Sequence, residues 1–262
     1  MHVILLVAAL AFIAYLFYFR LPKSERPAAA DNHLIDAGQK LLLAAKSTVK
    51  DITTTQKQVT VFKLNVLYEE ALPVGKAPIG SLLLLHGIAW GEDGTAKVWF
   101  QRNTIQIFAA AGFRVVAPDL PGTRMSRTSE QALDDSMKAP FIKALVEELH
   151  MEKVTIMGAS WGGSFSVPYL VSYGKDLVSS VQVCPMVSNY PRSLFEKTLT
   201  PTLVIHGDGD YRLGYNSYDI LKHLANVQHV VVANAGHAVF QEQPDPFHAA
   251  CLAFLSHHYA VQ

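Results

Sequence analysis

This chain has only two cysteines, no net charge and no glycosylation sequon, and these features argue against several classes of protein. Only Cys184 and Cys251 occur, both in apolar stretches without metal-ligand spacing, so we expect buried free thiols, no disulfide framework and no metal site. Basic and acidic residues number 22 each and form no basic block, which argues against a nucleic-acid partner. No Asn-x-Ser/Thr sequon is present. With 50% hydrophobic residues among 262, the chain can bury one large core.

The chain begins with an uninterrupted apolar run. Val3–Phe19 lies at the short edge of the roughly 17–25 residues that span a bilayer. The basic residues follow this run, at Arg20, Lys23 and Arg26, whereas a signal peptide carries them in front. We therefore predict a transmembrane anchor at residues 1–20 with the following domain in the cytosol. A cleaved signal peptide or a reversed orientation, with the domain in a secretory lumen, is the alternative.

Residues 21–57 are predicted to form a linker and a juxtamembrane helix. Asp31 or Asn32 would cap a helix that reaches about Lys50. Its apolar side would consist of Leu34, Ala37, Leu41, Leu42 and Ala45. This helix either lies on the membrane surface or packs on the domain that follows, and the residues alone leave both alternatives open.

From Gln58 onward, short apolar runs alternate with helical candidates. A hairpin at 59–68 opens this region, and later runs bounded by turn residues are Leu82–Leu85, Val115–Ala117, Val154–Ile156, Val181–Val183, Leu203–Ile205 and Val230–Val232. The helical candidates are Val98–Ala111, Phe141–His150, Tyr215–Leu224 and Phe247–His258. Continuous apolar strands that alternate with helices predict an α/β domain over 58–262, with a mainly parallel sheet covered on both faces.

A Gly-x-Ser-x-Gly motif follows one of these strands. Gly158-Ala159-Ser160-Trp161-Gly162 lies between the run at 154–157 and a stretch that can be helical. This is the nucleophile-elbow pattern, in which a tight turn lifts the serine hydroxyl above the sheet. A Cβ at position 158 or 162 would collide with a neighbouring strand or helix. Ser160 is the candidate nucleophile.

A serine nucleophile requires a histidine base and a carboxylate that orients it. His237 is the one late histidine in a small-residue turn after a strand, and the chain order Ser, Asp, His favours it. His206 ends a strand among neighbours that would satisfy it, whereas His223, His248, His257 and His258 fall in helical stretches and are predicted at the surface. Asp210 is the preferred acid because it lies deeper in its loop than Asp208. Asp119, an alternative acid, precedes Ser160 and is interpreted as structural.

Two backbone N–H groups are predicted to form an oxyanion hole. One belongs to Trp161, directly after the nucleophile, and the other to Ile88, in the turn His86-Gly87-Ile88 after the first parallel strand. The interval 187–201, between two predicted strands, is too short to hold a further domain over the site, which favours small or short acyl substrates. Trp90, Trp99 and Trp161 either line the site or pack in the core.

These motifs together resemble the α/β-hydrolase superfamily, over residues 58–262. Within it, several stretches are similar to the α/β-hydrolase domain-containing protein 14 group, namely 68–73, 82–88, 117–122, 167–170 and 234–238. The resemblance implies Ser160, Asp210 and His237 as a catalytic triad and hydrolysis of small acyl esters. One branch of the group implies acetyl transfer from acetylated lysine to coenzyme A, and the other carries an N-terminal membrane segment.

Three functions follow as hypotheses. The first is an esterase or thioesterase that forms an acyl-enzyme on Ser160 and uses no cofactor. The second is an acyltransferase with the same residues and coenzyme A as acceptor, although the sequence contains no phosphate-binding signature. The third is a non-catalytic binding protein that retains the fold. The sequence does not indicate an oligomeric state.

Overall fold

The computed structural model describes residues 32–88, 95–123, 126, 128–129, 131–188 and 190–260. The predicted anchor at 1–20 and the start of the predicted linker lie outside these residues. Among the described residues, no helix has both the length and the apolar character needed to cross a membrane.

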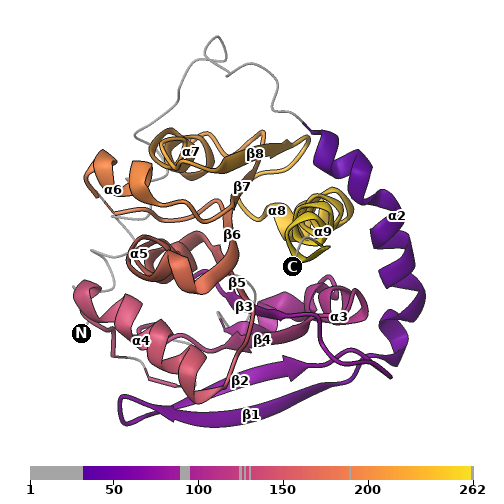
Figure 1. Cartoon of the computed structure of the whole chain (residues 1–262), viewed down its shortest axis with the longest axis horizontal. Coiled ribbons are helices and arrows are strands. Elements are labelled where there is room, and N and C mark those ends of the chain that lie inside the picture. Colours follow the sequence, from indigo (N-terminus) through magenta and orange to yellow (C-terminus); the bar gives the residue numbers. More distant parts are fainter. Residues whose placement is uncertain are drawn as a thin grey trace, which may run out of the picture. The chain divides into compact units, whose positions relative to one another are not determined.

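The described strands form one eight-stranded sheet in the order β1-β2-β4-β3-β5-β6-β7-β8 (Figure 1). Pairing of β2 with β1 and with β4 is antiparallel, and every other pair is parallel. The strands are β1 Thr54–Val61, β2 Leu64–Ala71, β3 Ser81–Leu85, β4 Arg114–Pro118, β5 Val154–Ala159, β6 Leu177–Val183, β7 Thr202–Gly207 and β8 Val227–Val232. The predicted mainly parallel sheet is confirmed, and each predicted apolar run lies within one of these strands.

Helices cover both faces of the sheet because the strands are apolar on both sides. Alternate residues of β3 enter different cores: Leu82 and Leu84 belong to one hydrophobic cluster, Leu83 and Leu85 to the other. The first cluster includes side chains of α2 His33–Thr48, α3 Thr104–Ala110, α8 Val239–Glu242 and α9 Pro244–Ala260. The second includes those of α4 Asp135–Glu148, α5 Gly163–Tyr173, α6 Arg192–Lys197 and α7 Leu213–Leu221. Figure 1 shows α4 and α5 on one side of the sheet and α3 and α9 on the other.

Two predicted helices differ from those observed. The helix predicted at 98–111 is divided into a 3-10 turn, Ala96–Phe100, and α3, because Asn103 adopts a left-handed conformation with φ of 56°. Helix α4 starts six residues before the predicted Phe141 and contains Pro140. Proline removes one helical hydrogen bond, and burial of the flanking Ala139 and Phe141 offsets this loss.

Helix α2 packs on the domain, which is the second of the two alternatives left open by the sequence. Its buried side is formed by Leu34, Gly38, Leu42 and Ala45. Gly38 lies so close to α9 that an added Cβ would be 1.8 Å from the carbonyl oxygen of Ala249. The predicted apolar side was wrong at Ala37 and Leu41, which are both exposed, Leu41 by 39%.

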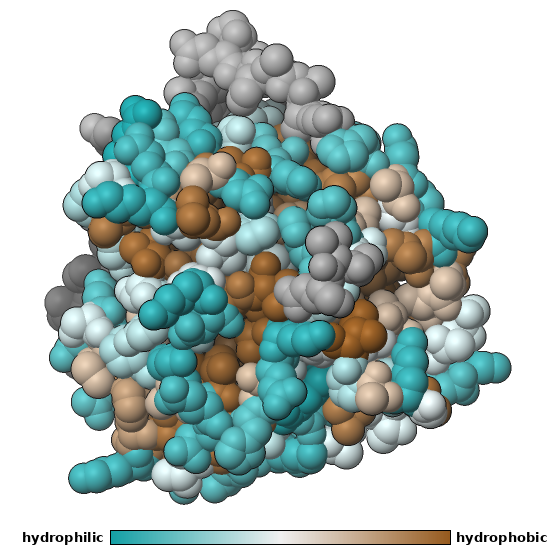
Figure 2. All heavy atoms as spheres, in the orientation of Figure 1, coloured by the Kyte–Doolittle hydropathy of each residue, from teal (hydrophilic) through white to brown (hydrophobic). Residues whose placement is uncertain are grey.

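No cap domain interrupts the described residues between β6 and β7, where α6 is the one helix. On the face shown in Figure 2, hydrophobic side chains gather toward the middle and hydrophilic ones dominate the periphery.

Candidate active site

Ser160 occupies a strained turn between β5 and α5. Its φ is 50°, in the left-handed region that residues with a side chain seldom adopt. A Cβ on Gly158 would lie 1.9 Å from the Oγ of Ser166 in α5, and one on Gly162 would lie 2.4 Å from the carbonyl oxygen of Leu85 at the end of β3. The predicted collisions at both glycines are therefore confirmed. The turn exists because these two positions lack side chains.

His237 lies between Ser160 and Asp210. Its Nε2 is 2.9 Å from the Oγ of Ser160, and its Nδ1 is 2.7 Å from the Oδ2 of Asp210. The three residues follow β5, β7 and β8, so parallel strands deliver all of them to one edge of the sheet. Ser160 and Asp210 are each 6% exposed, whereas the His237 side chain is 33% exposed. A small molecule can therefore reach the imidazole and the adjacent hydroxyl.

The surroundings of Asp210 keep its carboxylate ionised. Burial acts to raise its pKa, but the hydrogen bond and charge of His237 outweigh burial and hold the pKa below its ordinary value. The thiol of Cys184 and the backbone N–H of Leu213, 3.2 Å from Oδ1, donate further hydrogen bonds that act in the same direction. An ionised carboxylate can only accept hydrogen bonds, so Nδ1 of His237 carries the proton and Nε2 accepts from the hydroxyl of Ser160.

The two competing acids make different contacts. The Oδ1 of Asp208 accepts from the backbone N–H of Ala235 at 3.3 Å and joins the two loops. The Oδ1 of Asp119 accepts from the backbone N–H of Ala96 at 2.9 Å. Both carboxylates thus hold backbone in place, in agreement with the structural interpretation of Asp119.

The turn that follows β3 lies against the elbow. Gly162 packs against the carbonyl groups of Leu85 and His86, because a Cβ added to it would lie 2.4 Å and 2.8 Å from their oxygens. The Nε2 of His86 accepts from the backbone N–H of Leu120 at 2.9 Å, and this bond fixes the start of the turn. Ile88 comes next and its side chain is 46% exposed. Ile88 and Trp161, the predicted oxyanion residues, therefore belong to two backbone segments that meet at Gly162 of the elbow.

The tryptophans have different environments. Trp99 is fully buried and its ring lies 4.6 Å from that of Phe240, so it packs in the core. Trp161 is partly buried, with its ring 5.1 Å from Phe165 and 6.2 Å from His86. Trp90 lies outside the described residues.

Two other histidines are buried. His206 is bonded through Nε2 to the Nε2 of His229 at 2.9 Å, in agreement with a histidine satisfied by its neighbours. His248 was predicted at the surface, and this was wrong: it is fully buried and 3.0 Å from the Oγ1 of Thr104. Burial lowers its pKa to about 3. His248 is buried because it faces α3, where its ring lies 5.9 Å from that of Phe108.

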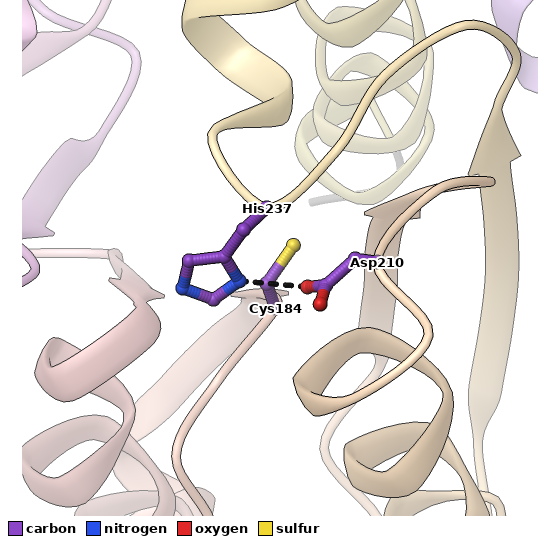
Figure 3. Close-up of side chains that lie close together, drawn as sticks. All are labelled: Cys184, Asp210 and His237. Atoms are coloured by element: carbon purple, nitrogen blue, oxygen red, sulfur yellow. Dashed lines mark hydrogen bonds and ion pairs between the residues drawn. The ribbon is translucent and has the colours of Figure 1, made fainter. Parts of the chain in front are cut away.

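Cys184 is a site residue that the sequence analysis missed. It follows β6 with φ of 44°, and its sulfur lies beside the hydrogen bond between His237 and Asp210 (Figure 3). Burial, followed by the charge of Asp210, raises the pKa of this thiol. The sequence did contain a signal for this position, because Cys184 directly follows a predicted strand, as Ser160 does. A cysteine in an apolar stretch is nevertheless typical of a core residue, so the signal was not used.

Comparisons with known proteins agree with this architecture. Residues 80–184 match the family model of the alpha/beta hydrolase fold. A hydrolase structure from Thermoplasma acidophilum, described as CIB-like, has a TM-score of 0.69 at 22% identity and covers 79% of this chain and 99% of its own. Carboxylesterase CesB of Bacillus subtilis has a TM-score of 0.66 at 17% identity and covers 84% of this chain and 98% of its own. At these identities the likeness establishes the fold.

The relatives found by sequence define the family, which the solved structures do not. Protein ABHD14A of Rattus norvegicus is 32% identical over 193 residues, which cover 73% of this chain and 78% of the relative. "Putative protein-lysine deacylase ABHD14B" of the same species is 31% identical over 209 residues, which cover 78% of this chain and 97% of the relative. The chain is therefore a hydrolase that belongs to the ABHD14 group of the α/β-hydrolase superfamily.

Proposed function

We propose that this chain is a serine esterase or thioesterase that acts on small or short acyl substrates through Ser160, His237 and Asp210. The observation that carries the proposal is the position of His237, within hydrogen-bond distance of both a strained serine and a buried carboxylate. A serine hydroxyl is a weak nucleophile, and a positioned imidazole is what activates it.

The proposed reaction begins when Nε2 of His237 accepts the proton of the Ser160 hydroxyl. The Oγ then bonds to the carbonyl carbon of the substrate, and the ionised carboxylate of Asp210 stabilises the imidazolium. As the tetrahedral intermediate collapses, His237 returns the proton to the departing alcohol or thiol. Water repeats the sequence on the acyl-enzyme and releases the acid.

Negative charge on the tetrahedral oxygen requires hydrogen-bond donors. We assign this role to the backbone N–H groups of Trp161 and Ile88, since the first follows the nucleophile and the second follows β3. Contact between Gly162 and the carbonyls that end β3 supports the pairing of these segments. Loss of one such donor costs on the order of 10²–10³ in turnover.

The size of the substrate is inferred from what covers the site. A single short helix, α6, stands in the described residues where larger hydrolases could carry a cap. A long acyl chain would find little apolar enclosure there. Short esters and thioesters are therefore the proposed substrate class.

Acyl transfer is the second candidate, favoured by the name of the relative ABHD14B as a protein-lysine deacylase. The same acyl-enzyme would form from an acylated lysine, and coenzyme A would replace water as the acceptor. The rate of deacylation with and without coenzyme A distinguishes the two: acceleration by the thiol supports transfer, and an unchanged rate supports hydrolysis.

We also propose that residues 1–20 anchor the protein in a membrane with the catalytic domain in the cytosol, on the basis of the apolar run 3–19 and the basic residues after it. Alkaline carbonate extraction tests the anchor, since an anchored chain remains with the membranes. Protease protection in intact microsomes tests the orientation, and a shielded domain would contradict it.

Labelling with a fluorophosphonate probe tests the catalytic proposal directly. Wild-type protein is expected to react, whereas folded Ser160→Ala and His237→Ala are expected not to. Absence of labelling in folded wild-type protein would overturn both the hydrolytic and the transfer mechanism. Turnover of p-nitrophenyl esters of increasing length then measures acyl preference.

A further inference from the structure

A thiol, a carboxylate and an imidazole converge at the carboxyl end of the sheet. The Sγ of Cys184, a carboxylate oxygen of Asp210 and a ring nitrogen of His237 all lie within 4.8 Å of one another (Figure 3). Cysteine, histidine and aspartate are the side chains that bind zinc in proteins. From this cluster we infer a Zn²⁺ site whose occupation inactivates the serine centre.

The three ligand atoms lie nearly as close together as they would around a bound zinc ion. Ligands of a tetrahedral zinc, at about 2.0–2.3 Å from the metal, lie about 3.2–3.6 Å from one another. The cluster would need to contract by up to about 1.2 Å, while the bonded pair His237–Asp210 opens slightly from 2.7 Å. Rotation of the three side chains would supply such shifts while the loops that carry Asp210 and His237 stay in place. A water molecule would complete the four ligands.

An ion has a route into the cluster. Cys184 is fully buried and Asp210 nearly so, but the His237 side chain is 33% exposed. In Figure 3 the ring nitrogen that faces Asp210 also faces the side of the thiol. Zinc would thus enter past the imidazole and replace the proton that Nδ1 shares with Asp210.

Zinc at this position prevents catalysis through the histidine tautomer. Binding to Nδ1 uses the lone pair of that nitrogen, so its proton moves to Nε2 and the imidazole stays neutral. The thiol becomes a zinc-bound thiolate and releases its proton to solvent. Nε2 then carries a hydrogen and accepts nothing, so the proton of Ser160 has no acceptor. Inhibition therefore rests on the proposed function, whereas metal binding does not.

Spectroscopy with Co²⁺ tests the site without an activity assay. We expect the full chain to develop the near-ultraviolet absorption of a cobalt–thiolate bond and Zn²⁺ to displace it. Cys184→Ala and Cys184→Ser should lose this band, and the alanine variant should bind Zn²⁺ at least about 100-fold more weakly, since even outer-shell changes cost 10–100-fold. Cys251→Ala is the matched control, because Cys251 is the other fully buried free thiol.

Activity provides the second measurement. Zn²⁺ should inhibit wild type and Cys251→Ala over the same concentration range, while Cys184→Ala should require at least about 100-fold more. Ser160→Ala should be inactive yet keep the cobalt band. A wild-type spectrum without a thiolate band, or one unchanged by loss of Cys184, would overturn the site. A band that depends on Cys184 in a protein without hydrolase activity would support the site and contradict the proposed function instead.

Discussion

Gly207 and Ala235 bring the acid loop and the histidine loop into backbone contact. A Cβ on Gly207 would lie 2.1 Å from the carbonyl oxygen of Ala235, and that oxygen accepts from the N–H of Gly209 at 2.8 Å. Asp210 and His237 each lie within three residues of this contact. Their separation of 2.7 Å is thus set by backbone packing as well as by their own hydrogen bond.

Gly207→Ala is expected to impair both activity and stability. The added methyl would push the loops apart, and a misplacement of about 1 Å can cost roughly 10²-fold in turnover. Overpacking of this kind destabilises by about 1–3 kcal/mol. Turnover of p-nitrophenyl acetate and urea unfolding measure the two effects. Gly75→Ala, whose Cβ would have no atom within 4 Å, is the control for turnover alone and should retain full turnover, because its φ of 71° strains an alanine and so affects stability.

The two aspartates of the loop after β7 should differ sharply. Asp210→Asn would stabilise the wrong histidine tautomer and lower turnover by about 10⁴-fold. Asp208→Asn retains an oxygen acceptor for the N–H of Ala235, so its turnover should stay within about tenfold of wild type. Equal losses in the two variants would contradict the assignment of the acid.

Glu70 is predicted to contribute stability that disappears in acid. Burial acts to raise its pKa, but hydrogen bonds from Lys57 and Arg114 outweigh burial and hold the pKa below its ordinary value of 4.5. Because the folded-state pKa is lowered, this stability is present above pH 4.5 and is lost as the pH falls through the folded-state value.

Glu70→Gln should lower the free energy of unfolding at pH 7 by about 1–3 kcal/mol, the value of hydrogen bonds to a charged group, and by less at pH 4. Glu196→Gln removes an exposed ion pair with Arg192 and should cost at most about 0.5 kcal/mol at both values of pH. A Glu70 variant with the same loss at pH 7 and pH 4 would refute the electrostatic explanation. Urea unfolding provides the measurement.

His248 should make the protein less stable below neutral pH. Its folded-state pKa of about 3 lies below the ordinary value of 6.5, so between these two values of pH the histidine is protonated in the unfolded chain and neutral in the folded chain. Stability is therefore lost as the pH falls from 6.5, by about 2 kcal/mol at pH 5. His248→Gln should flatten this part of the pH profile, and His257→Gln, at an exposed position of the same helix, should leave it unchanged.

The local sequence pattern was sufficient to predict much of the fold and of the candidate site. Strands buried on both faces have continuous apolar runs, and a polar residue directly after such a run lies at the edge where parallel strands end. Ser160 was predicted in this way, whereas Asp210 and His237 were predicted from their places in the loops after two later strands and from their order along the chain. The order of these residues along the chain predicted that they converge. The distances between their side chains depend on the conformations of the loops, which the sequence pattern does not give.

The failures have tertiary causes. His248 was assigned to the surface because nothing near it in sequence indicates that Thr104 and Phe108 of α3, some 140 residues earlier, pack against it. Ala37 and Leu41 were assigned to the apolar side of α2 but are exposed, because a helical stripe does not reveal how wide the contact is. Cys184 was correctly predicted to be a buried free thiol, but its position beside Asp210 could not be predicted, because a thiol in an apolar stretch counts as core until its neighbours are known.

The contact of α2 with α9 has a consequence for biosynthesis. Among the described elements, α2 is synthesised first and its partner α9 last, so Leu34 and Leu42 stay uncovered until nearly all of this domain has been made. Contacts between such distant segments form slowly and leave apolar surface open to aggregation in the meantime. Truncation that removes α9 should therefore expose the apolar side of α2, and chaperones would be needed most before α9 emerges.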